Sequence, residues 1–545
     1  MAEDTSQLSE QAGNSNSKPP SKFGGLYSHW VLFVLVLVYI FNFIDRNILS
    51  ILAEDIKADL GVSDAEMGFL YGTAFAVFYA VFGIPLARFA DVWVRRSLVS
   101  VGLLFWSAMT ALSGLARSFP VLAMFRIGVG IGEASASPAA YSMLSDYYAP
   151  RHRATVIGIY SSGVYIGGGI GLMLGGLILD NWAQAFPQPG SAPFGLKGWH
   201  VAFMAVGVPG MVLAGLVRLL REPMRGASEG LITAAHPEPF KVLKTELAAV
   251  IPPFTIWSVY QHGASVKKNL LAAMMLALVA WGLAYVTGNI LQWVALAIAV
   301  YVTISWLQGL SHRDPASFGM LFHSKALIFT TLAFPTMAFV AYGTSFWTAP
   351  FLMRVHEASA ADIGWYVGIG NAMGGLIGVV LGGVLGDRLK LKMVNGRLLV
   401  GFITILTTAP LILWMLYTEH IETAYWLNFA YHIPASMWVS IAPATANDLV
   451  MPRMRATAGA WFLLMNTIIG LALGPYLMGR LSDYFIAQGA DSGSALTDAI
   501  ASAQVMFILT AVLLVLAMRY LPADEASRLE RAEALGEKVE KAATE

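Results

Sequence analysis

The chain alternates between long apolar runs and short polar segments. Runs long enough to cross about 30 Å of hydrocarbon begin near residues 30, 66, 97, 120, 154 and 199, and six more begin near 326, 361, 397, 422, 456 and 499. A further apolar stretch of 39 residues, Leu270 to Gln308, lies between the two groups and is interrupted by "TGN" at 287–289. The pattern predicts an all-α polytopic membrane protein with two six-helix bundles and an extra transmembrane hairpin between them.

Composition supports the membrane class and argues against several kinds of chemistry. Hydrophobic residues make up 57% of the chain and charged residues only 12%, whereas a soluble globular protein carries about 25% charged residues. The net charge of zero argues against a nucleic-acid partner. The chain has no cysteine, which excludes thiolate metal sites and cysteine nucleophiles. Because the sequence also lacks a Walker loop and any recognisable metal or nucleophile constellation, we expect neither an enzyme nor a bound cofactor.

The same pattern divides the chain into five parts. We expect a disordered polar tail at 1–28, a first bundle at 29–221, a linker at 222–325 that contains the hairpin at 270–308, a second bundle at 326–521 and a charged tail at 522–545. Basic residues concentrate in the loops on the side of the N-terminus, whereas the other loops hold only Lys57, Arg117, Lys197 and Arg354. The positive-inside rule then predicts that both termini are cytoplasmic.

The two bundles are related by an internal repeat. The segment "DYYAPRHRAT" (146–155) aligns with "DLVMPRMRAT" (448–457) at an offset of 302 residues, and "SDAEMGFLYG" (63–72) aligns with "SAADIGWYVG" (359–368) at an offset of 296. Repeated bundles are typical of pseudo-symmetric transporters, which bind their substrate between the two halves.

Four charged residues lie inside the apolar spans of the first half. "FNFIDRNILS" (41–50) contains Asp45 and Arg46, and "FRIGVGIGE" (125–133) contains Arg126 and Glu133. At 1.5 Å per residue, Asp45 and Arg126 lie at the same depth and Glu133 lies deeper, near the middle of the membrane. Adjacent helical residues diverge by about 100°, so we predict that Arg126, rather than Arg46, faces Asp45.

These charges predict proton coupling. A charge near the bilayer centre costs about 2.5–3.5 kcal/mol on insertion scales, and desolvation there disfavours the ionised form of a carboxyl. We predict that Glu133 is the main proton carrier and Asp45 the second, with Arg126 pairing with whichever is deprotonated or holding an anionic headgroup. The alternative is a buried salt bridge that only fixes helix register, but such a pair could be replaced by apolar residues with little loss.

The second half contributes polar and aromatic residues in place of charges. Any one of them could instead face lipid or pack against a neighbouring helix. Together with Asp45, Arg126 and Glu133 they would form a cavity that is charged on one side and apolar on the other, which suits an amphipathic ligand. The predicted substrate-binding residues of this half are Tyr342, Thr344, Ser345, Phe346, Asn371, His432, Ser436, Trp438 and Asn466.

Each bundle also carries a charged turn after its second span, "ARFADVWVRR" (87–96) and "GVLGDRLKLK" (383–392). An aspartate at a helix C-terminus needs a cationic partner, because the helix dipole disfavours a negative charge there. The alternative is that the basic residues only fix topology. We predict a cytoplasmic latch of the outward-open state, formed by Asp91, Arg95, Arg96, Asp146, Arg151, Arg153, Asp387, Arg388, Asp448, Arg453 and Arg455.

Longer motifs carry a family resemblance. With "FNFIDRNILS", "RIGVGIGEA", "SPAAYSMLSDYYAPRHRAT" and "GIYSSGVYIGGGIG", residues 30 to 220 resemble the Spinster family of the major facilitator superfamily. The charged turns resemble the superfamily's cytoplasmic loop signature, although Ala87, Val92 and Val94 depart from it. The fifth span resembles the antiporter motif of exporting members, except that Leu172 stands where proline is usual. Its glycines also fit plain helix packing.

The resemblance implies a fold, a substrate class and a location. It implies the major facilitator fold and places Asp45, Arg126 and Glu133 at the family's coupling and substrate positions. Eukaryotic Spinster proteins move lysophospholipids and sphingosine-1-phosphate, and the short loops here resemble a bacterial member in the inner membrane. We therefore expect a monomeric, proton-driven transporter that exports or translocates a lipid-like substrate by alternating access. The alternatives are an uptake symporter or uniporter for a small organic anion, and a non-transporting sensor or lipid-binding scaffold.

Overall fold

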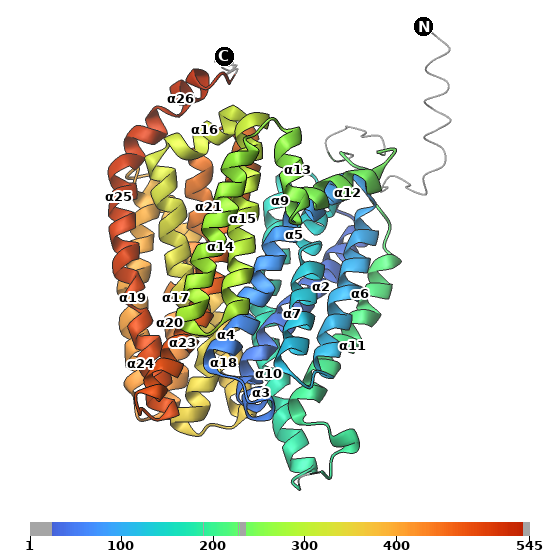
Figure 1. Ribbon diagram of the computed structural model, residues 1–545, viewed down its shortest axis with the longest axis vertical. Coiled ribbons are helices and arrows are strands. Elements are labelled where there is room, and N and C mark those ends of the chain that lie inside the picture. The colour runs from blue at the N-terminus through green and yellow to red at the C-terminus, as the bar shows by residue number, and fades with distance from the viewer. Residues whose placement is uncertain (1–23, 189, 227, 229–235, 538–545) are drawn as a thin grey trace.

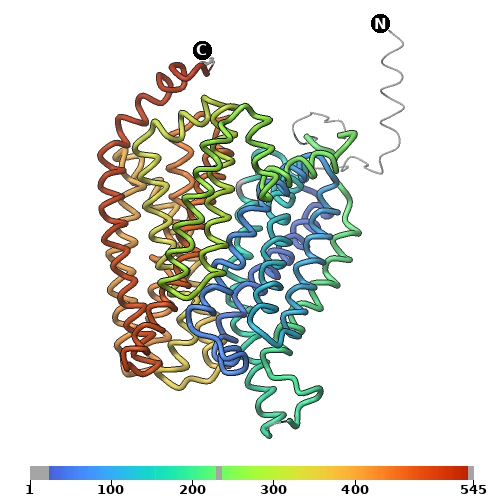
Figure 2. Tube along the Cα trace, in the orientation of Figure 1, coloured from blue at the N-terminus to red at the C-terminus, as the bar shows by residue number. Residues whose placement is uncertain are grey.

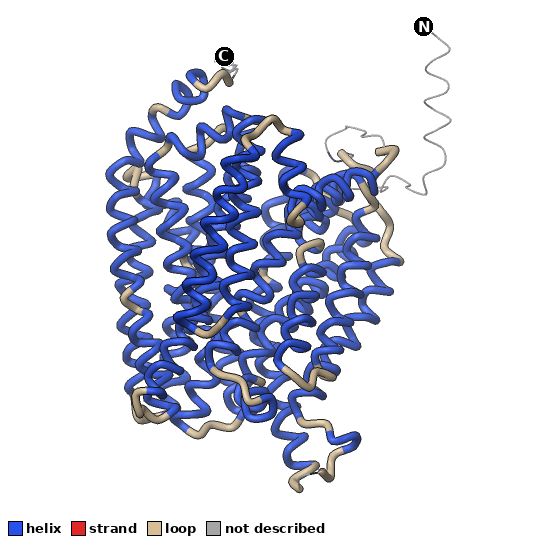
Figure 3. The backbone as a smooth tube through the Cα atoms, viewed as in Figure 1, coloured by secondary structure: helices blue, strands red, loops and turns tan. Residues whose placement is uncertain are grey.

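The structure is a computed structural model of the chain and describes residues 24–537 except 189, 227 and 229–235. Every regular element in this part is a helix (Figure 3). Thirteen of these helices are long and apolar enough to cross a membrane. The predicted all-α polytopic class is therefore confirmed, whereas the predicted disorder of the N-terminal tail concerns residues that lie mostly outside the described part.

The first bundle is formed by six spans, three of which are built from two consecutive helices. The first span begins three residues before the predicted boundary, and a short helix, α3 (Ala53–Leu60), connects it to the second. The spans are α2 (Leu26–Ile51), α4 (Asp64–Tyr71) with α5 (Thr73–Val92), α6 (Arg95–Ser113), α7 (Phe119–Glu133) with α8 (Ala136–Tyr147), α9 (Arg153–Ser161) with α10 (Gly163–Ala185), and α11 (Gly198–Arg218).

The second bundle repeats this plan. Its fourth span, formed by α20 and α21, is not among the thirteen apolar helices; it contains the buried polar residues Asn428, His432 and Ser436, and it packs against α18 and α19. The spans are α17 (Lys325–His356), α18 (Ala360–Lys390), α19 (Gly396–Tyr417), α20 (Ile421–Ser436) with α21 (Trp438–Asp448), α22 (Arg455–Met465) with the π-helix η6 (Asn466–Ala472) and α23 (Leu473–Ala487), and α24 (Ser492–Ala503) with α25 (Met506–Ala526).

The region of the predicted hairpin forms two helices, α14 (Val266–Thr287) and α15 (Ile290–Arg313), which together extend beyond both ends of the expected range 270–308. The chain turns between them at Gly288, whose φ of 77° favours glycine. In Figure 1 the hairpin lies across the junction of the bundles, and α15 packs against both α5 and η6. The rest of the linker forms α12 (Pro239–Val250), α13 (Phe254–Gln261) and α16 (Pro315–His323).

Both ends of the described chain lie at the same end of the molecule (Figures 1 and 2). We call this end the terminal face and the other end the opposite face. The short helix α26 (Arg528–Ala534) extends the second bundle at the terminal face. The two bundles stand side by side, and each extends from the terminal face to the opposite face (Figure 2). Any path between the bundles therefore runs from one face to the other.

Candidate functional site

The four charged residues of the first half come together inside the bundle. Asp45, Arg126 and Glu133 are fully buried and Arg46 is 8% exposed. Arg46 Nη2 donates to Glu133 Oε2 at 2.9 Å, which joins α2 to α7. We call these four residues the buried charge cluster. Its formal charge is zero when all four are ionised, so protonation of either carboxyl leaves one positive charge uncompensated.

The pairing inside the cluster differs from the prediction. Arg126 Nη1 donates to the backbone carbonyl of Asp45 at 3.0 Å, rather than to its carboxylate. The predicted approach of Arg126 to Asp45 is thus present, but through the backbone. Glu133 was predicted to pair with Arg126, and it is bound instead by Arg46, for which no partner was predicted. Helical geometry fixes the direction of the Cα–Cβ bond, whereas a long arginine side chain carries its charged head well away from that direction.

Aromatic rings hold the two guanidinium groups in place. The Arg46 guanidinium carbon lies 4.2 Å from the centroid of the Phe75 ring and 4.6 Å from that of Phe43. Arg126 lies 6.0 Å from the same Phe75 ring. Cation–π contacts of this kind stabilise a desolvated cation by about 2 kcal/mol. Sequence reasoning missed these rings; the three-residue spacing of Phe43 and Arg46 on one helix face was the available signal.

Several polar atoms of the cluster have no hydrogen-bond partner. Both carboxyl oxygens of Asp45, one of Glu133, and Nε and Nη2 of Arg126 are buried and unpartnered among the described residues. Trp106 and Thr110 of α6 lie beside the Asp45 carboxyl, and their N–H and hydroxyl groups are likewise unpartnered. Unsatisfied buried groups cost about 1–3 kcal/mol each. These unpartnered groups can therefore accept a proton, bind an anion or form a new hydrogen bond.

Some predicted residues of the second half lie at the junction of the bundles. Phe346 stacks on Tyr71 of the first half at 4.4 Å between centroids, and its carbonyl accepts from Ser50 at 2.5 Å. Tyr342 lies within electrostatic range of Tyr71 and of Tyr165, and Tyr165 also contacts Ser436. Tyr71 in turn lies within electrostatic range of Arg46 and Arg126, so it connects Tyr342 of the second half to the buried charge cluster.

Other predicted residues make their contacts within the second half. Asn371 accepts from Asn428 at 2.9 Å, and His432 Nδ1 lies 2.9 Å from the Asn428 carbonyl. Trp438 stacks on Phe334 at 6.4 Å. Thr344 and Asn466 are buried and Ser345 is partly buried. Contact of any of these residues with a substrate remains a prediction.

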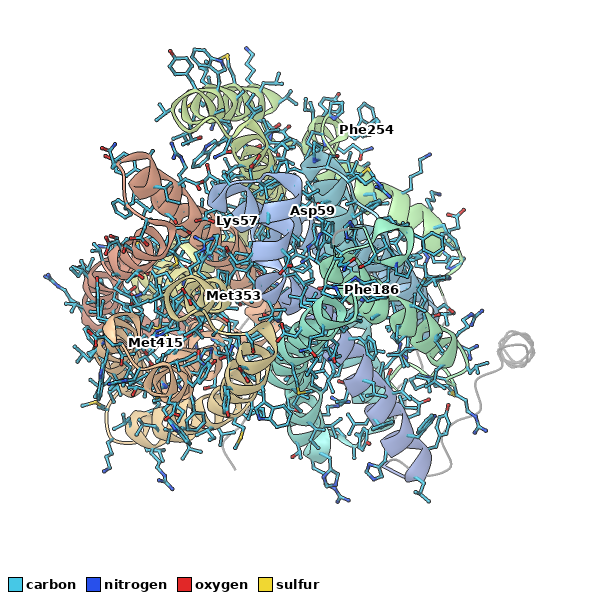
Figure 4. All side chains as sticks on the ribbon, turned by 90° about the horizontal axis from the view of Figure 1, so that it is seen from below. Lys57, Asp59, Phe186, Phe254, Met353 and Met415 are labelled. Carbon is cyan, nitrogen blue, oxygen red and sulfur yellow. The ribbon has the colours of Figure 1, made fainter. Side chains whose placement is uncertain are left out.

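The opposite face carries an ionic network between the halves that the sequence did not predict. Arg354, at the end of α17, binds Glu54 at 2.7 Å and Asp64 at 2.6 Å. Lys57 also pairs with Asp64, and Ser482 donates to Asp64 at 2.7 Å. Seen from this face, Lys57 of the first half lies near Met353 of the second (Figure 4). Sequence reasoning used Lys57 and Arg354 only to fix topology.

Two aspartates cap helices of the opposite half at the same face. Asp483 of α23 accepts from the backbone N–H groups of Asp64 and Ala65 at 3.0 and 2.8 Å. Asp180 of α10 accepts from the N–H of Ala361 at 2.9 Å. A carboxylate at a helix N-terminus satisfies free donors and the helix dipole. The capped helices α4 and α18 begin in the repeated segments 63–72 and 359–368, so the repeat corresponds to two crossed caps.

Glycines allow the halves to touch at this face. A Cβ on Gly176 would lie 2.0 Å from the carbonyl oxygen of Ala360, and one on Gly479 would lie 2.3 Å from that of Asp64. Other glycines of the fifth span, Gly167 and Gly171, pack against α2. The glycine pattern therefore has a packing role, and the antiporter interpretation remains a prediction.

At the terminal face, charged pairs form within each half. Arg95 binds Asp146 at 2.5 Å and Glu222 at 2.8 Å. The matching pair in the second half is Arg397 with Asp448 at 2.6 Å, and Arg397 also binds Asp387 at 2.8 Å. Arg397 was missed by sequence reasoning, although it follows Arg95 by the same 302 residues that relate the repeats.

The other residues of the predicted latch also lie at the terminal face. Among the described residues, the ion pairs at this face lie within one bundle or the linker, or between a bundle and the linker or the tail, so the latch of another state remains a prediction. Asp91 pairs with Arg88 at 3.8 Å, Arg96 donates to the Leu220 carbonyl at 2.5 Å, Arg153 donates to Ser228 at 2.8 Å, Arg151 contacts His152 at 3.0 Å, and Arg388 and Arg455 are exposed.

Comparison with known proteins agrees with this architecture. The family model described as Major Facilitator Superfamily matches residues 35–475, most of the chain. The chain belongs to this superfamily. It is a multi-pass membrane transporter of the Spinster-like kind.

Individual relatives give the same result. A crystal structure described as a bacterial homologue of the human lysosomal transporter Spinster, inward-facing and unoccupied, is 27% identical, with a TM-score of 0.63 over 93% of this chain and 99% of that one. An MFS-type efflux pump of Mycolicibacterium smegmatis is 28% identical over 83% of each chain. Protein spinster of Drosophila melanogaster is 22% identical over 84% of this chain and 62% of its own.

The paired arginines of this superfamily transporter should differ in their contribution to stability. Arg95→Gln leaves two acids near a fully buried site, and breaking a buried pair costs about 3–5 kcal/mol. Arg397 has an 18% exposed side chain and Asp448 a 32% exposed one, so Arg397→Gln should cost about 1 kcal/mol. Thermal unfolding followed by tryptophan fluorescence would measure both, and equal losses would contradict the difference in burial.

Arg453 links the linker to the C-terminal tail. It binds Asp314, just after α15, at 2.8 Å, and it also pairs with Glu537. These hydrogen bonds to Arg453 lower the pKa of Asp314 to about 2. The unfolded value is about 3.9, so the contact contributes fully above pH of about 4 and is lost as the pH falls toward 2.

We therefore expect the tail to remain attached throughout the physiological pH range. Because the chain has no cysteine, single cysteines introduced at exposed positions of α16 and of the segment after α26 can carry spin labels. Their separation should be constant from pH 8 to about pH 4. Detachment near pH 6 would contradict the lowered pKa values of Asp314 and Glu537, and Arg453→Gln, which removes the partner of both carboxylates, should detach the tail at every pH.

Proposed function

We propose that this chain is a proton-coupled secondary transporter that moves an amphipathic anion, such as a lysophospholipid or a sphingoid phosphate, by alternating access. It acts as a monomer in a bacterial inner membrane, with both termini in the cytoplasm, and translocates its substrate across that membrane. In this orientation the opposite face is periplasmic, and the network at Asp64 and Arg354 closes the path on that side. The conformation is then inward-facing.

The observation that carries the proposal is the Arg46–Glu133 pair beside the unpaired Asp45 carboxyl. Protonation of Glu133 removes the negative partner of Arg46 and leaves the cluster with one uncompensated positive charge. That charge favours binding of an anionic headgroup. Release of the headgroup restores the need for a negative partner, so Glu133 gives up its proton. Proton occupancy and substrate occupancy are thus coupled through the same arginine.

The character of the surrounding residues supports an amphipathic substrate. The described part of the first half places two arginines and two acids at the centre. The predicted substrate-binding residues of the second half at the junction, Tyr342, Phe346 and Ser436, carry no charge. A headgroup on the charged side and an apolar chain on the other side would satisfy both surfaces.

A small organic anion is the second candidate. Arg126 keeps Nε and Nη2 without partners, and a guanidinium with two free donors suits a carboxylate bound in bidentate fashion. Such a substrate would not need the apolar half of the junction. Its transport would use the same proton machinery.

Flux measurements in proteoliposomes test the proposal. Transport of lysophospholipid and of sphingosine-1-phosphate is measured with and without an imposed pH gradient. Flux that rises with the gradient supports the lipid function. An internal pH change on addition of a small carboxylate, without lipid flux, would retain proton coupling and replace the substrate. No response to either would favour the sensor or scaffold alternative.

A further inference from the structure

A polar cavity lies away from the buried charge cluster, between the tip of the hairpin and the first bundle. Its volume is about 220 Å³, and its walls include Glu66 of α4, Phe119 of α7, and Asn289 and Gln292 of the hairpin. These residues lie toward the opposite face, where α4 and α7 begin. All of its described lining residues come from the first bundle and the hairpin and none comes from the second bundle, so the cavity lies outside the path between the two halves.

Gln292 is the feature of this cavity that requires an explanation. Its side chain is 1% exposed, and both its amide nitrogen and its amide oxygen lack a hydrogen-bond partner. Burying an amide without hydrogen-bond partners destabilises the folded protein. An apolar side chain at this position of the hairpin would avoid that cost. An unpartnered amide that lines a cavity indicates a ligand able to bond with it.

The other walls select the chemistry of that ligand. Glu66 uses one carboxylate oxygen to accept from the N–H of Ser63 at 2.9 Å, which leaves the second oxygen available. Asn289 donates its amide N–H to Tyr476 at 3.2 Å, which leaves its amide oxygen. With the Gln292 oxygen, this gives three acceptors for the three N–H donors of a primary ammonium group.

Aromatic rings and charge point to the same ligand. The rings of Phe69 and Phe119 also line the cavity, with centroids 5.9 Å apart. Aromatic faces attract an ammonium group. The lining carries one carboxylate and no basic side chain. Next to the cavity, Ile290 is 65% exposed and Leu291 is 49% exposed, so its mouth adjoins the apolar outer surface of the hairpin.

We infer that this cavity binds a primary ammonium group, supplied by the ethanolamine headgroup of a phospholipid. The hairpin tip also touches the second bundle, because Trp293 packs edge-on against Tyr476 at 5.7 Å between centroids. A headgroup in the cavity therefore ties the first bundle, the hairpin and the second bundle together at the face where the halves are closed. Its binding favours this conformation over one in which that face is open.

Lipid binding to the full chain tests the inference. The purified protein is titrated with phosphatidylethanolamine, and with phosphatidylcholine of the same acyl chains, and retention is measured by native mass spectrometry together with the shift in Tm. We expect retention of one phosphatidylethanolamine and a loss of affinity of at least about tenfold in Glu66→Gln, which is about 1.4 kcal/mol. Glutamine can still accept at the start of α4, so the helix cap is kept.

Matched variants separate the site from general effects. Glu422→Gln changes an exposed acid in the first turn of α20 and should leave lipid retention unchanged. Gln292→Leu should weaken binding without any change of charge, and it keeps the test valid if Glu66→Gln fails to fold. If free ethanolamine raises the Tm of the protein but the two lipids are retained equally, the cavity is still an ammonium site, and its ligand is a soluble amine rather than a lipid headgroup. Equal retention of both lipids, unchanged in both variants, would overturn the inference.

Discussion

Glu133→Gln is expected to abolish transport driven by a pH gradient and to leave substrate exchange partly intact. Glutamine has nearly the shape of a protonated glutamate but cannot release a proton. Arg46 then loses the partner that it binds at 2.9 Å, and the cluster is held in its proton-loaded charge state. Breaking a buried pair costs about 3–5 kcal/mol, which is a factor of more than about one hundred in the equilibrium that depends on it.

The measurement compares gradient-driven flux with counterflow exchange in the same proteoliposomes. Gradient-driven flux should fall to the background, whereas exchange should remain within about tenfold of the wild type, because exchange requires no net proton release. Glu422→Gln serves as the exposed control. Loss of both activities would count against the proton role of Glu133, and unchanged gradient-driven flux would exclude it.

The same measurement can test the observed pairing. Arg46→Gln should disturb Glu133 directly, whereas Arg126→Gln removes a donor to the Asp45 carbonyl. If Arg46 is the partner that matters for coupling, the effects of Glu133→Gln and Arg46→Gln on counterflow exchange, which Glu133→Gln leaves measurable, should not add. Additive effects would indicate that the two residues act independently.

Gly176→Val should keep the opposite face from closing. Even the first carbon of the new side chain would lie 2.0 Å from the backbone oxygen of Ala360, and backbone cannot move aside as a flexible side chain can. Overpacking costs about 1–3 kcal/mol, which shifts the ratio of conformations by about 5- to 150-fold. The population in which the opposite face is closed should therefore fall, and transport with it.

Spin-label distances across the opposite face would measure this shift. The chain has no cysteine, so Gln184→Cys and Glu419→Cys, both at exposed positions of this face, can be labelled without other changes. We expect a longer distance in Gly176→Val than in the parent. Gly158→Ala is the control on the same span, because nothing lies within 4 Å of a Cβ at that position. An unchanged distance distribution in Gly176→Val would show that the face closes without this contact.

The position of the charged residues could be predicted from sequence, but their pairing could not. Apolar runs with Asp45, Arg46, Arg126 and Glu133 inside them are visible in one dimension, and insertion costs make such residues stand out. Which acid each arginine reaches depends on helix rotation and on rotamers, which follow from packing against rings such as Phe75. A helical wheel gives only the angular positions of residues on one helix, so it cannot represent packing against other helices.

The network at the opposite face shows the same division. Arg354 and Asp64 are 290 residues apart, and nothing in the sequence next to either residue indicates that the two form an ion pair. The 296-residue repeat marked the segments in which α4 and α18 begin. That Asp483 and Asp180 cap these helices across the junction depends on how the two bundles dock.

By itself, the sequence determined the spans, the extra hairpin, the repeat and the presence of ionisable groups within the membrane, because hydropathy and periodicity are local properties of the chain. Only the tertiary structure decided the partner of Glu133, the closure at Arg354, the role of Arg397 and the cavity beside Gln292. These depend on distances of a few ångströms between residues far apart in sequence, and such distances are set by the packing of whole helices.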